Sequence, residues 1–213
     1  MTYLVKEIYY TLQGEGTHSG RPAVFCRFSN CNLWTGREKD RPRAICQFCD
    51  TDFVGTDGPG GGRFAAAAGL AAAVSAQWQA HAHARAQPYV VCTGGEPLLQ
   101  LDQAAVEALH AAGFEVGVET NGTRQAPAGL DWVCVSPKAG APLRLTRGDE
   151  LKLVYPQEGA DPEMFEDLAF PRLLLQPMDG PEREKNTRLA VEYCLSHPQW
   201  RLSLQTHKYL GIA

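Results

Sequence analysis

Residues 89–97 of the chain read YVVCTGGEP. An apolar, β-branched run that stops at two glycines is typical of a buried strand that ends in a tight turn. Short apolar runs of this kind recur along the chain, and segments with a helical pattern separate several of them. Alternating strands and helices favour a mainly parallel sheet. About six such strands are too few for a complete eight-unit barrel, so the sequence predicts an α/β fold with a partial barrel.

The expected elements follow from these runs and from the residues that bound them. Asp102 is a candidate N-cap, and the alanine-rich run after Phe64 is a strong helix former. The segment that joins residues 132–136 to 150–155 is too short for a long helix. Loops are expected at 35–44 and 55–62, which lack periodicity or are rich in glycine. We expect strands at 23–28, 89–93, 114–120, 132–136, 150–155, 173–176 and 201–205, and helices at 64–83, 102–112 and 183–196.

Length and composition exclude several classes of protein. The 213 residues fit a single domain, 1–213, and the net charge of −4 without a dense basic block argues against nucleic-acid binding. No apolar run approaches the roughly 18 residues that a membrane helix needs. The first residues also lack the charged and then apolar pattern of a signal peptide. We therefore expect a cytoplasmic protein that binds no membrane.

Three of the seven cysteines gather in one predicted loop at about residues 30–50. Cys46 and Cys49 have two residues between them, a spacing that suits a shared metal or cluster, and Cys31 precedes them. Three thiolates can hold a 4Fe-4S cluster that leaves one iron open for another ligand. Structural zinc is the alternative, for which His18 is the nearest fourth ligand in the sequence. The remaining cysteines lie in apolar strands or in a helix, and we expect them to be buried and not to bind iron: Cys26, Cys92, Cys134 and Cys194.

Clusters of polar residues follow the ends of the predicted strands. They occupy residues 93–97, 119–122, 136–138, 176–178 and 205–208, and Lys152 lies within a strand. Active residues of parallel α/β folds gather where strands end and loops begin. We therefore expect these clusters to converge on one mouth.

The motifs resemble the radical S-adenosylmethionine superfamily. Gly94-Gly95-Glu96-Pro97 matches its glycine-rich motif, although Thr35 stands where its second cysteine would fall and an insertion delays that thiol to Cys46. Within the superfamily the chain is similar to the 7-carboxy-7-deazaguanine synthases, and the similarity covers residues 13–211. The segments that carry it are 13–16 with 20–22, 25–28, 49–51, 93–97, 119–122, 136–138, 176–178 and 205–211.

The resemblance implies two cofactors and the residues that hold them. A 4Fe-4S cluster would bind Cys31, Cys46 and Cys49, and its open iron would bind S-adenosylmethionine. The two glycines would let the backbone approach the cofactor, and Glu96 would accept a hydrogen bond from its amino group. The residues expected at S-adenosylmethionine are Phe48, Gly94, Gly95, Glu96, Ser136, Lys138 and Gln176.

The resemblance also implies a pterin substrate, 6-carboxy-5,6,7,8-tetrahydropterin, whose ring contracts to 7-carboxy-7-deazaguanine with loss of ammonia. The ring offers donors and acceptors that paired amide and carboxylate side chains match, and Arg27 would clamp the carboxylate. Mg²⁺ is expected at Thr51. A flavodoxin or ferredoxin would donate the electron, and a homodimer is expected. The residues expected at the substrate are Gln13, Gly14, Glu15, Arg27, Thr93, Glu119, Asn121 and His207.

Two other functions fit parts of the pattern. A radical activase that makes a glycyl radical in another protein would keep the cluster and lack a pterin pocket. A zinc-stabilised binding module would have no catalysis and one zinc ion per chain.

Overall fold

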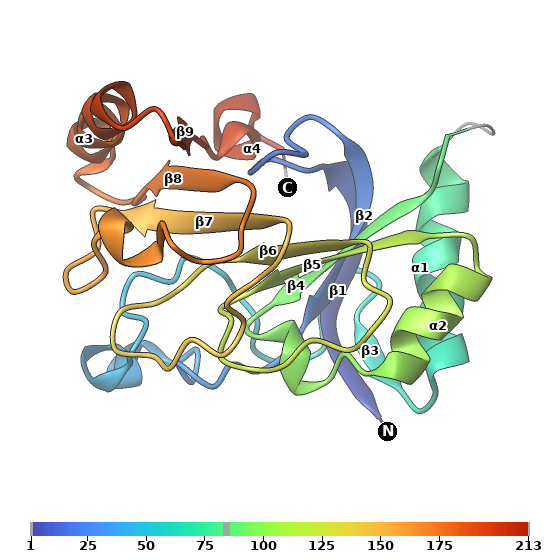
Figure 1. Cartoon of the computed structure of the whole chain (residues 1–213). Coiled ribbons are helices and arrows are strands. Elements are labelled where there is room, and N and C mark those ends of the chain that lie inside the picture. Colours follow the sequence, from blue (N-terminus) through green and yellow to red (C-terminus); the bar gives the residue numbers. More distant parts are fainter. Residues whose placement is uncertain (1, 83–85, 213) are drawn as a thin grey trace.

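The computed structural model describes residues 2–82 and 86–212. Their strands form one sheet, in the order β3-β1-β2-β4-β5-β6-β7-β8-β9 (Figure 1). The strands are β1 (Tyr3–Leu12), β2 (Pro22–Phe28), β3 (Gly62–Phe64), β4 (Tyr89–Gly94), β5 (Glu115–Thr120), β6 (Trp132–Val135), β7 (Glu150–Tyr155), β8 (Leu173–Pro177) and β9 (Trp200–Leu202).

Four α-helices and three short 3₁₀ helices connect the strands among the described residues. The longer α-helices pack on one face of the sheet: α1 against β1 and β2, α2 against β5, and α3 against β8 and β9. The α-helices are α1 (Ala67–His81), α2 (Gln103–Ala111), α3 (Arg183–Ser196) and α4 (Thr206–Leu210), and the 3₁₀ helices are η1 (Glu38–Arg43), η2 (Pro97–Leu99) and η3 (Pro162–Phe165).

The seven strands β2 and β4 to β9 pair in parallel, and β1 and β3 add two antiparallel strands at one edge. The expected α/β fold with a mainly parallel, partial-barrel sheet is confirmed. The sheet has nine strands among the described residues, two more than the seven expected, because neither β1 nor β3 was foreseen. The sequence YLVKEIYYTL mixes charged and aromatic residues, so it lacks the apolar run that marks the central strands. It pairs with β2 over most of its length.

The two faces of the sheet differ in composition because side chains alternate along each strand. On β7, Leu151 and Leu153 are fully buried in the main hydrophobic core beneath the helices. Lys152 and Val154 alternate with them and point to the opposite, inner face, where they line a cavity. The same alternation on the neighbouring strands places a row of polar side chains on the inner face of the partial barrel.

The ends of several elements differ from expectation. Phe64 ends β3 and the helix begins at Ala67, while the expected helix end at His83 lies outside the described residues. The last strand is short, and the segment after it turns into α4, since Thr206 donates back to the carbonyl of Gly14. No helix of the described chain has the length and apolar character that crossing a membrane requires.

Candidate active site

Two adjoining cavities open at the carboxyl ends of the parallel strands. We call the first, of about 190 Å³, the thiol cavity, because Cys31, Cys46 and Cys49 line it. We call the second, of about 280 Å³, the Arg27 cavity. The strand ends thus converge, as the position of the polar clusters predicted. Six residues line both cavities: Glu15, Asp50, Thr51, Thr93, Glu119 and Gln205.

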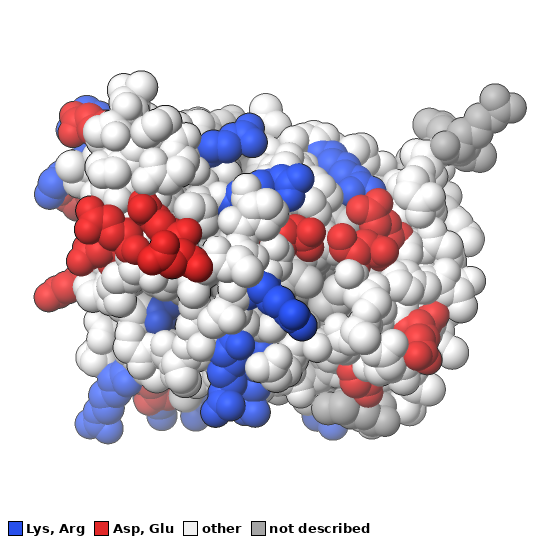
Figure 2. Space-filling model, in the orientation of Figure 1, with Lys and Arg blue, Asp and Glu red and all other residues white. Residues whose placement is uncertain are grey.

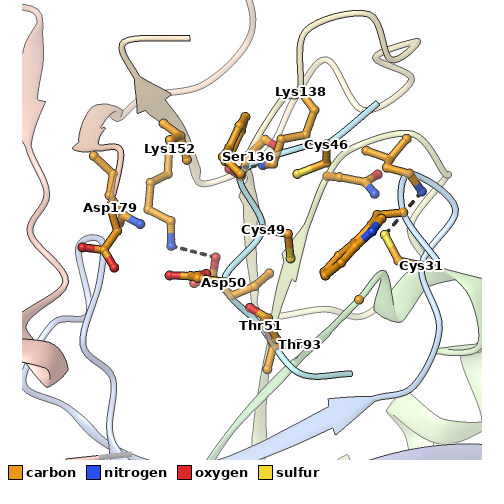
Figure 3. Close-up of a pocket in the computed structure, with 18 of the residues that line it drawn as sticks. Cys31, Cys46, Cys49, Asp50, Thr51, Thr93, Ser136, Lys138, Lys152 and Asp179 are labelled. Carbon is orange, nitrogen blue, oxygen red and sulfur yellow. Dashed lines mark hydrogen bonds and ion pairs between the residues drawn. The ribbon is translucent and has the colours of Figure 1, made fainter. Parts of the chain in front are cut away.

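The cluster loop, residues 29–55, carries the three thiols and closes its insertion on itself. The backbone N–H groups of Ile45 and Cys46 both donate to the carbonyl of Leu33, at 3.1 and 3.4 Å. The fourteen residues between the first two cysteines therefore return the chain to a point two residues beyond Cys31. Figure 3 shows the three labelled cysteines around one part of the pocket. The insertion lengthens the loop and still leaves the thiols together.

Arg41, in η1, ties the insertion to the cysteines. Its guanidinium stacks over the ring of Trp34 at 4.0 Å and donates to the carbonyls of Gln47 and Cys49 at 2.8 and 3.0 Å. It also forms an ion pair with Glu38 at 2.6 Å. Sequence reasoning did not single out Arg41, because a basic residue in a polar loop carries no signal of its partners.

The thiols suit an iron-sulfur cluster as a donor set. Cys46 donates a hydrogen bond to the sulfur of Cys49, and this bond lowers the pKa of the Cys49 thiol and raises that of Cys46. Burial raises the pKa of the Cys31 thiol, as it would for an isolated thiol held among apolar groups. Among the described residues that line this cavity there is no histidine. Three sulfur donors without a histidine or a fourth cysteine among the lining residues fit a cluster with one open iron.

His18 cannot complete a zinc site with these thiols. Its ring lies 4.1 Å from that of Trp132, centre to centre, and its Nδ1 is 3.3 Å from the hydroxyl of Tyr89. None of these residues lines the thiol cavity. The zinc alternative that used His18 is therefore wrong. The remaining cysteines also lie elsewhere: Cys26, Cys92 and Cys134 are buried in strands, and Cys194, in α3, is half-buried.

Gly94 and Gly95 line the thiol cavity and also hold the cluster loop close to the sheet. A β-carbon on Gly95 would overlap the carbonyl oxygen of Asn30, and Gly94 has a positive φ of 134°. The N–H of Glu96 donates to the carbonyl of Asn30 at 2.9 Å. The glycines therefore let the chain approach its own cluster loop, in addition to the expected approach to a cofactor.

Glu96 is fully buried and does not line either cavity. Its carboxylate accepts hydrogen bonds from the N–H of Leu98 at 2.9 Å, from the Thr120 hydroxyl at 2.7 Å and from the N–H of Asn121 at 2.8 Å. Burial raises the pKa of this carboxyl. In this structure Glu96 joins the ends of β4 and β5, and its expected contact with the cofactor stays a prediction.

The other residues expected at S-adenosylmethionine line the thiol cavity. The Lys138 ammonium donates to the carbonyl and hydroxyl oxygens of Ser136 at 2.6 and 2.7 Å, and it lies 6.0 Å from the centre of the Phe48 ring. Burial lowers the pKa of Lys138. Gln176 is buried on β8 and accepts a hydrogen bond from the Ser203 hydroxyl at 3.3 Å.

Most residues expected at the substrate line the Arg27 cavity. Arg27 donates from Nε to Glu7 and from Nη2 to the Tyr9 hydroxyl, both at 2.7 Å. The side chain of Gln13 donates from Nε2 to Glu119 at 3.1 Å, and its Oε1 accepts from the N–H of Glu15 at 3.1 Å. Asn121 instead lines the thiol cavity, and Thr51 lies at the junction of the two cavities and donates a hydrogen bond to the Cys49 sulfur.

Lys152 is the main functional candidate that the site assignment missed. It is only 3% exposed and forms ion pairs with Glu15 at 2.7 Å and with Glu119 at 2.9 Å. Burial opposes the ionisation of Glu15, but the Lys152 ammonium outweighs it and lowers the pKa of Glu15 to about 2. Burial raises the pKa of Glu119. The sequence signal that could have identified it is a lysine flanked by leucines, Leu151-Lys152-Leu153, within an apolar run.

Acidic groups also surround the inner end of this lysine. One ligand atom from each of Glu119, Cys134 and Glu150 lies within 4.8 Å of the others. These groups raise the pKa of Lys152 well above its ordinary value, although burial acts in the opposite direction. The lysine supplies the positive charge that such a cluster requires, so we do not interpret the cluster as a metal site.

The C-terminal helix α4 covers the junction of the cavities. His207 lines the Arg27 cavity and packs so closely on Gly14 that a β-carbon there would overlap its ring. Burial lowers the pKa of His207. Lys208, which sequence reasoning left without a partner, forms ion pairs with Asp50 of the cluster loop and with Asp179 after β8.

Comparisons with known proteins reveal close relatives along the full chain, although no family model matches. The chain is 68% identical over 212 residues to the 7-carboxy-7-deazaguanine synthase of Caulobacter vibrioides and 67% identical to that of Bradyrhizobium diazoefficiens, each match covering 100% of both chains. Among solved structures, QueE from Escherichia coli superposes with a TM-score of 0.72 at 29% identity, over 97% of this chain and 95% of that one.

Proposed function

The chain belongs to the 7-carboxy-7-deazaguanine synthase family, and from that membership we propose its reaction. It is a radical S-adenosylmethionine lyase that converts 6-carboxy-5,6,7,8-tetrahydropterin into 7-carboxy-7-deazaguanine and ammonia, a step of queuosine and 7-deazapurine biosynthesis. The observation that carries this proposal is the shared wall of the two cavities, since a radical formed in one must reach a substrate in the other. The relatives' shared name supports the product.

Cys31, Cys46 and Cys49 would hold the 4Fe-4S cluster, because they are the thiols that line the cavity. With S-adenosylmethionine bound beside these thiols, a reduced cluster would supply radical chemistry directed at the hydrogen atom on C6 of the pterin. The protein orients the reactants and excludes water. The buried strand ends around the thiol cavity suit that role.

The polar residues of the thiol cavity would bind S-adenosylmethionine. Lys138 offers an ammonium group to the carboxylate of the cofactor, and a nearby anion would offset the cost of burying that charge. Ser136 and Gln176 offer hydroxyl and amide groups to the ribose and adenine, and Phe48 offers a ring face. These groups lie at the ends of β6 and β8 and on the cluster loop, so three separate elements of the fold position them.

The Arg27 cavity would bind the pterin. Arg27 already uses Nε and Nη2, which leaves Nη1 for the substrate carboxylate and fixes the plane of the guanidinium. Gln13, Glu15 and Glu119 provide the amide and carboxylate groups that match the N–H groups and carbonyl of the ring. His207 covers the opening from α4.

Thr51 would be the protein ligand of Mg²⁺. Its hydroxyl lies at the junction of the cavities, next to the last cluster cysteine. One hydroxyl does not make a cage, so the ion would keep several waters and depend on the substrate carboxylate, as Mg²⁺ commonly does. We further propose, from the family resemblance, a flavodoxin or ferredoxin as electron donor, a homodimer and a cytoplasmic location.

The direct test is turnover by the anaerobically reconstituted, reduced protein with S-adenosylmethionine, Mg²⁺ and the carboxytetrahydropterin. We expect 7-carboxy-7-deazaguanine by mass spectrometry and an equal amount of ammonia by enzymatic assay. Tetrahydropterin without the 6-carboxylate is the matched control, and we expect no turnover of it because Arg27 has no carboxylate to bind. Unchanged pterin after incubation, with about four irons per chain verified by the cube stoichiometry, would refute the proposal.

A further inference from the structure

A buried lysine and two half-buried carboxylates form an ion-pair triple at the boundary between the cavities. Lys152 reaches inward from β7, and a dashed line in Figure 3 marks one of its ion pairs. Its ammonium binds Glu15, from the turn between β1 and β2, and Glu119, from β5. We call Glu15, Lys152 and Glu119 the lysine bridge. Its members come from three separate parts of the chain and meet at one nitrogen atom.

The lysine bridge faces both ligands that the proposed function requires. Glu15 and Glu119 line the thiol cavity and the Arg27 cavity, whereas Lys152 lines the thiol cavity. A second hydrogen bond orients each carboxylate: Gln205 donates to Glu15 at 2.9 Å and Gln13 donates to Glu119 at 3.1 Å. Each carboxylate thus has a fixed direction and keeps lone pairs for another donor, because a carboxylate accepts about four hydrogen bonds.

We propose that Lys152 is a positioning residue for pterin binding: its ammonium holds the carboxylates of Glu15 and Glu119 aimed at the cavity boundary, where they accept hydrogen bonds from N–H groups of the substrate. This inference rests on the proposed function, since it requires a ligand with several N–H donors. Lys152 acts through the two carboxylates and does not itself contact the pterin, because it does not line the Arg27 cavity.

Charge explains why the carboxylates need the lysine. Two half-buried carboxylates near one point repel each other, and the loss of their shared cation favours protonation of one of them. A protonated carboxyl loses acceptor capacity and fails to match a donor of the ring. No other cation pairs with Glu15 or Glu119 in the described part of the chain. Other titratable and charged groups also face the bridge from surrounding elements: Tyr9, Tyr89, Cys134, Lys138, Glu150 and His207.

The test measures the Kd of the carboxytetrahydropterin by calorimetric titration of reconstituted protein with S-adenosylmethionine, between pH 6 and pH 9. Lys152→Met should weaken binding about 10- to 100-fold at pH 7, the range for hydrogen bonds to charged groups. The Kd of this variant should fall as the pH rises, because the trapped proton leaves. The wild type should be flatter over that range. Lys152→Arg should keep the Kd within a few-fold of the wild type.

Lys185→Met is the matched control, since Lys185 is exposed, forms a surface ion pair with Glu182 and lines neither cavity. It should bind like the wild type at every pH. Lys152→Gln provides a second removal of charge in case the methionine variant does not fold. A wild-type Kd in both Lys152 variants would overturn the proposal, as would equal weakening at every pH. Failure of both to fold would assign Lys152 to stability alone and would also overturn it.

The two proposals can fail separately in this experiment. If the wild type binds the pterin but forms no product, the proposed function is contradicted. The Kd values of the Lys152 variants then still test the role of Lys152. A wild type that binds no pterin contradicts both proposals. A wild type that binds and turns over, with Lys152→Met indistinguishable from it, overturns only the role of the lysine.

Discussion

The cluster loop and the inner face of the sheet build the two halves of the site by different means. In the loop, a few backbone hydrogen bonds and the contacts of Arg41 bring the thiols together. On the inner face, the strand ladder itself fixes where Arg27, Glu119 and Lys152 point. The loop tolerates an insertion of many residues, whereas a shift of one residue in a strand would reverse its side chains.

The two faces of the sheet repeat this contrast on a smaller scale. The outer face buries Leu151 and Leu153 under helices, and these side chains serve stability. The inner face carries charges that cost stability unless they are paired, as Lys152 is. Side chains that pack in the core and side chains that line the cavity thus alternate along the same strand. Figure 2 shows the outer surface, where a group of acidic side chains gathers at the left of the view.

The largest effect should come from the cluster loop. Cys46→Ala should reduce product formation below detection and lower the iron content, because the proposed cluster would lose one of its three ligands. Cys194→Ala is the matched control, since Cys194 lies in α3, outside both cavities. Iron analysis and product assay check both variants. Full activity in Cys46→Ala would show that the ligand assignment is wrong.

The outer face should affect stability and leave binding unchanged. Leu153→Ala should lower the free energy of unfolding by about 2–5 kcal/mol, because a fully buried leucine leaves a cavity. The pterin Kd, measured on folded protein, should stay within a few-fold of the wild type. Urea denaturation and titration give the two values. A large loss of affinity with little loss of stability would remove the distinction between the faces.

The ion pairs of the inner face should make the free energy of unfolding depend on pH in the acid range. The pKa of Glu15 falls from its ordinary value to about 2 on folding, so its ionisation stabilises the fold above about pH 4.5. That contribution, up to about 3 kcal/mol, is lost as the pH falls toward 2. Glu15→Gln should therefore show a shallower decrease in stability over this range. Equal pH dependence in both proteins, by chemical denaturation, would contradict the Lys152–Glu15 pairing.

The smallest effect should come from loosening the insertion. Arg41→Ala removes two hydrogen bonds to cluster-loop carbonyls and the stacking on Trp34. We expect a few-fold faster loss of iron to a chelator and a melting temperature within a few degrees of the wild type, since the loop adds little to the core. An unchanged rate of iron loss would show that backbone hydrogen bonds alone hold the loop.

The sequence was sufficient to predict the fold class and the convergence of the polar residues that follow the strands, because both depend on local patterns. An apolar run indicates a strand whichever strand it pairs with. Cysteine is recognisable as a metal ligand from its residue type alone. It did not predict the partners of Lys152 or Lys208, because these depend on strand order and on where α4 returns to the sheet. The role of Glu96 as a bridge between two strand ends was hidden for the same reason.

The central claim is that a cofactor in the thiol cavity and a pterin in the Arg27 cavity meet at their shared wall. The most direct test uses pterin deuterated at C6 and follows the label by mass spectrometry after turnover. The account predicts deuterium at the 5′ carbon of recovered S-adenosylmethionine or 5′-deoxyadenosine. Product formation with no deuterium ever reaching that carbon would contradict it.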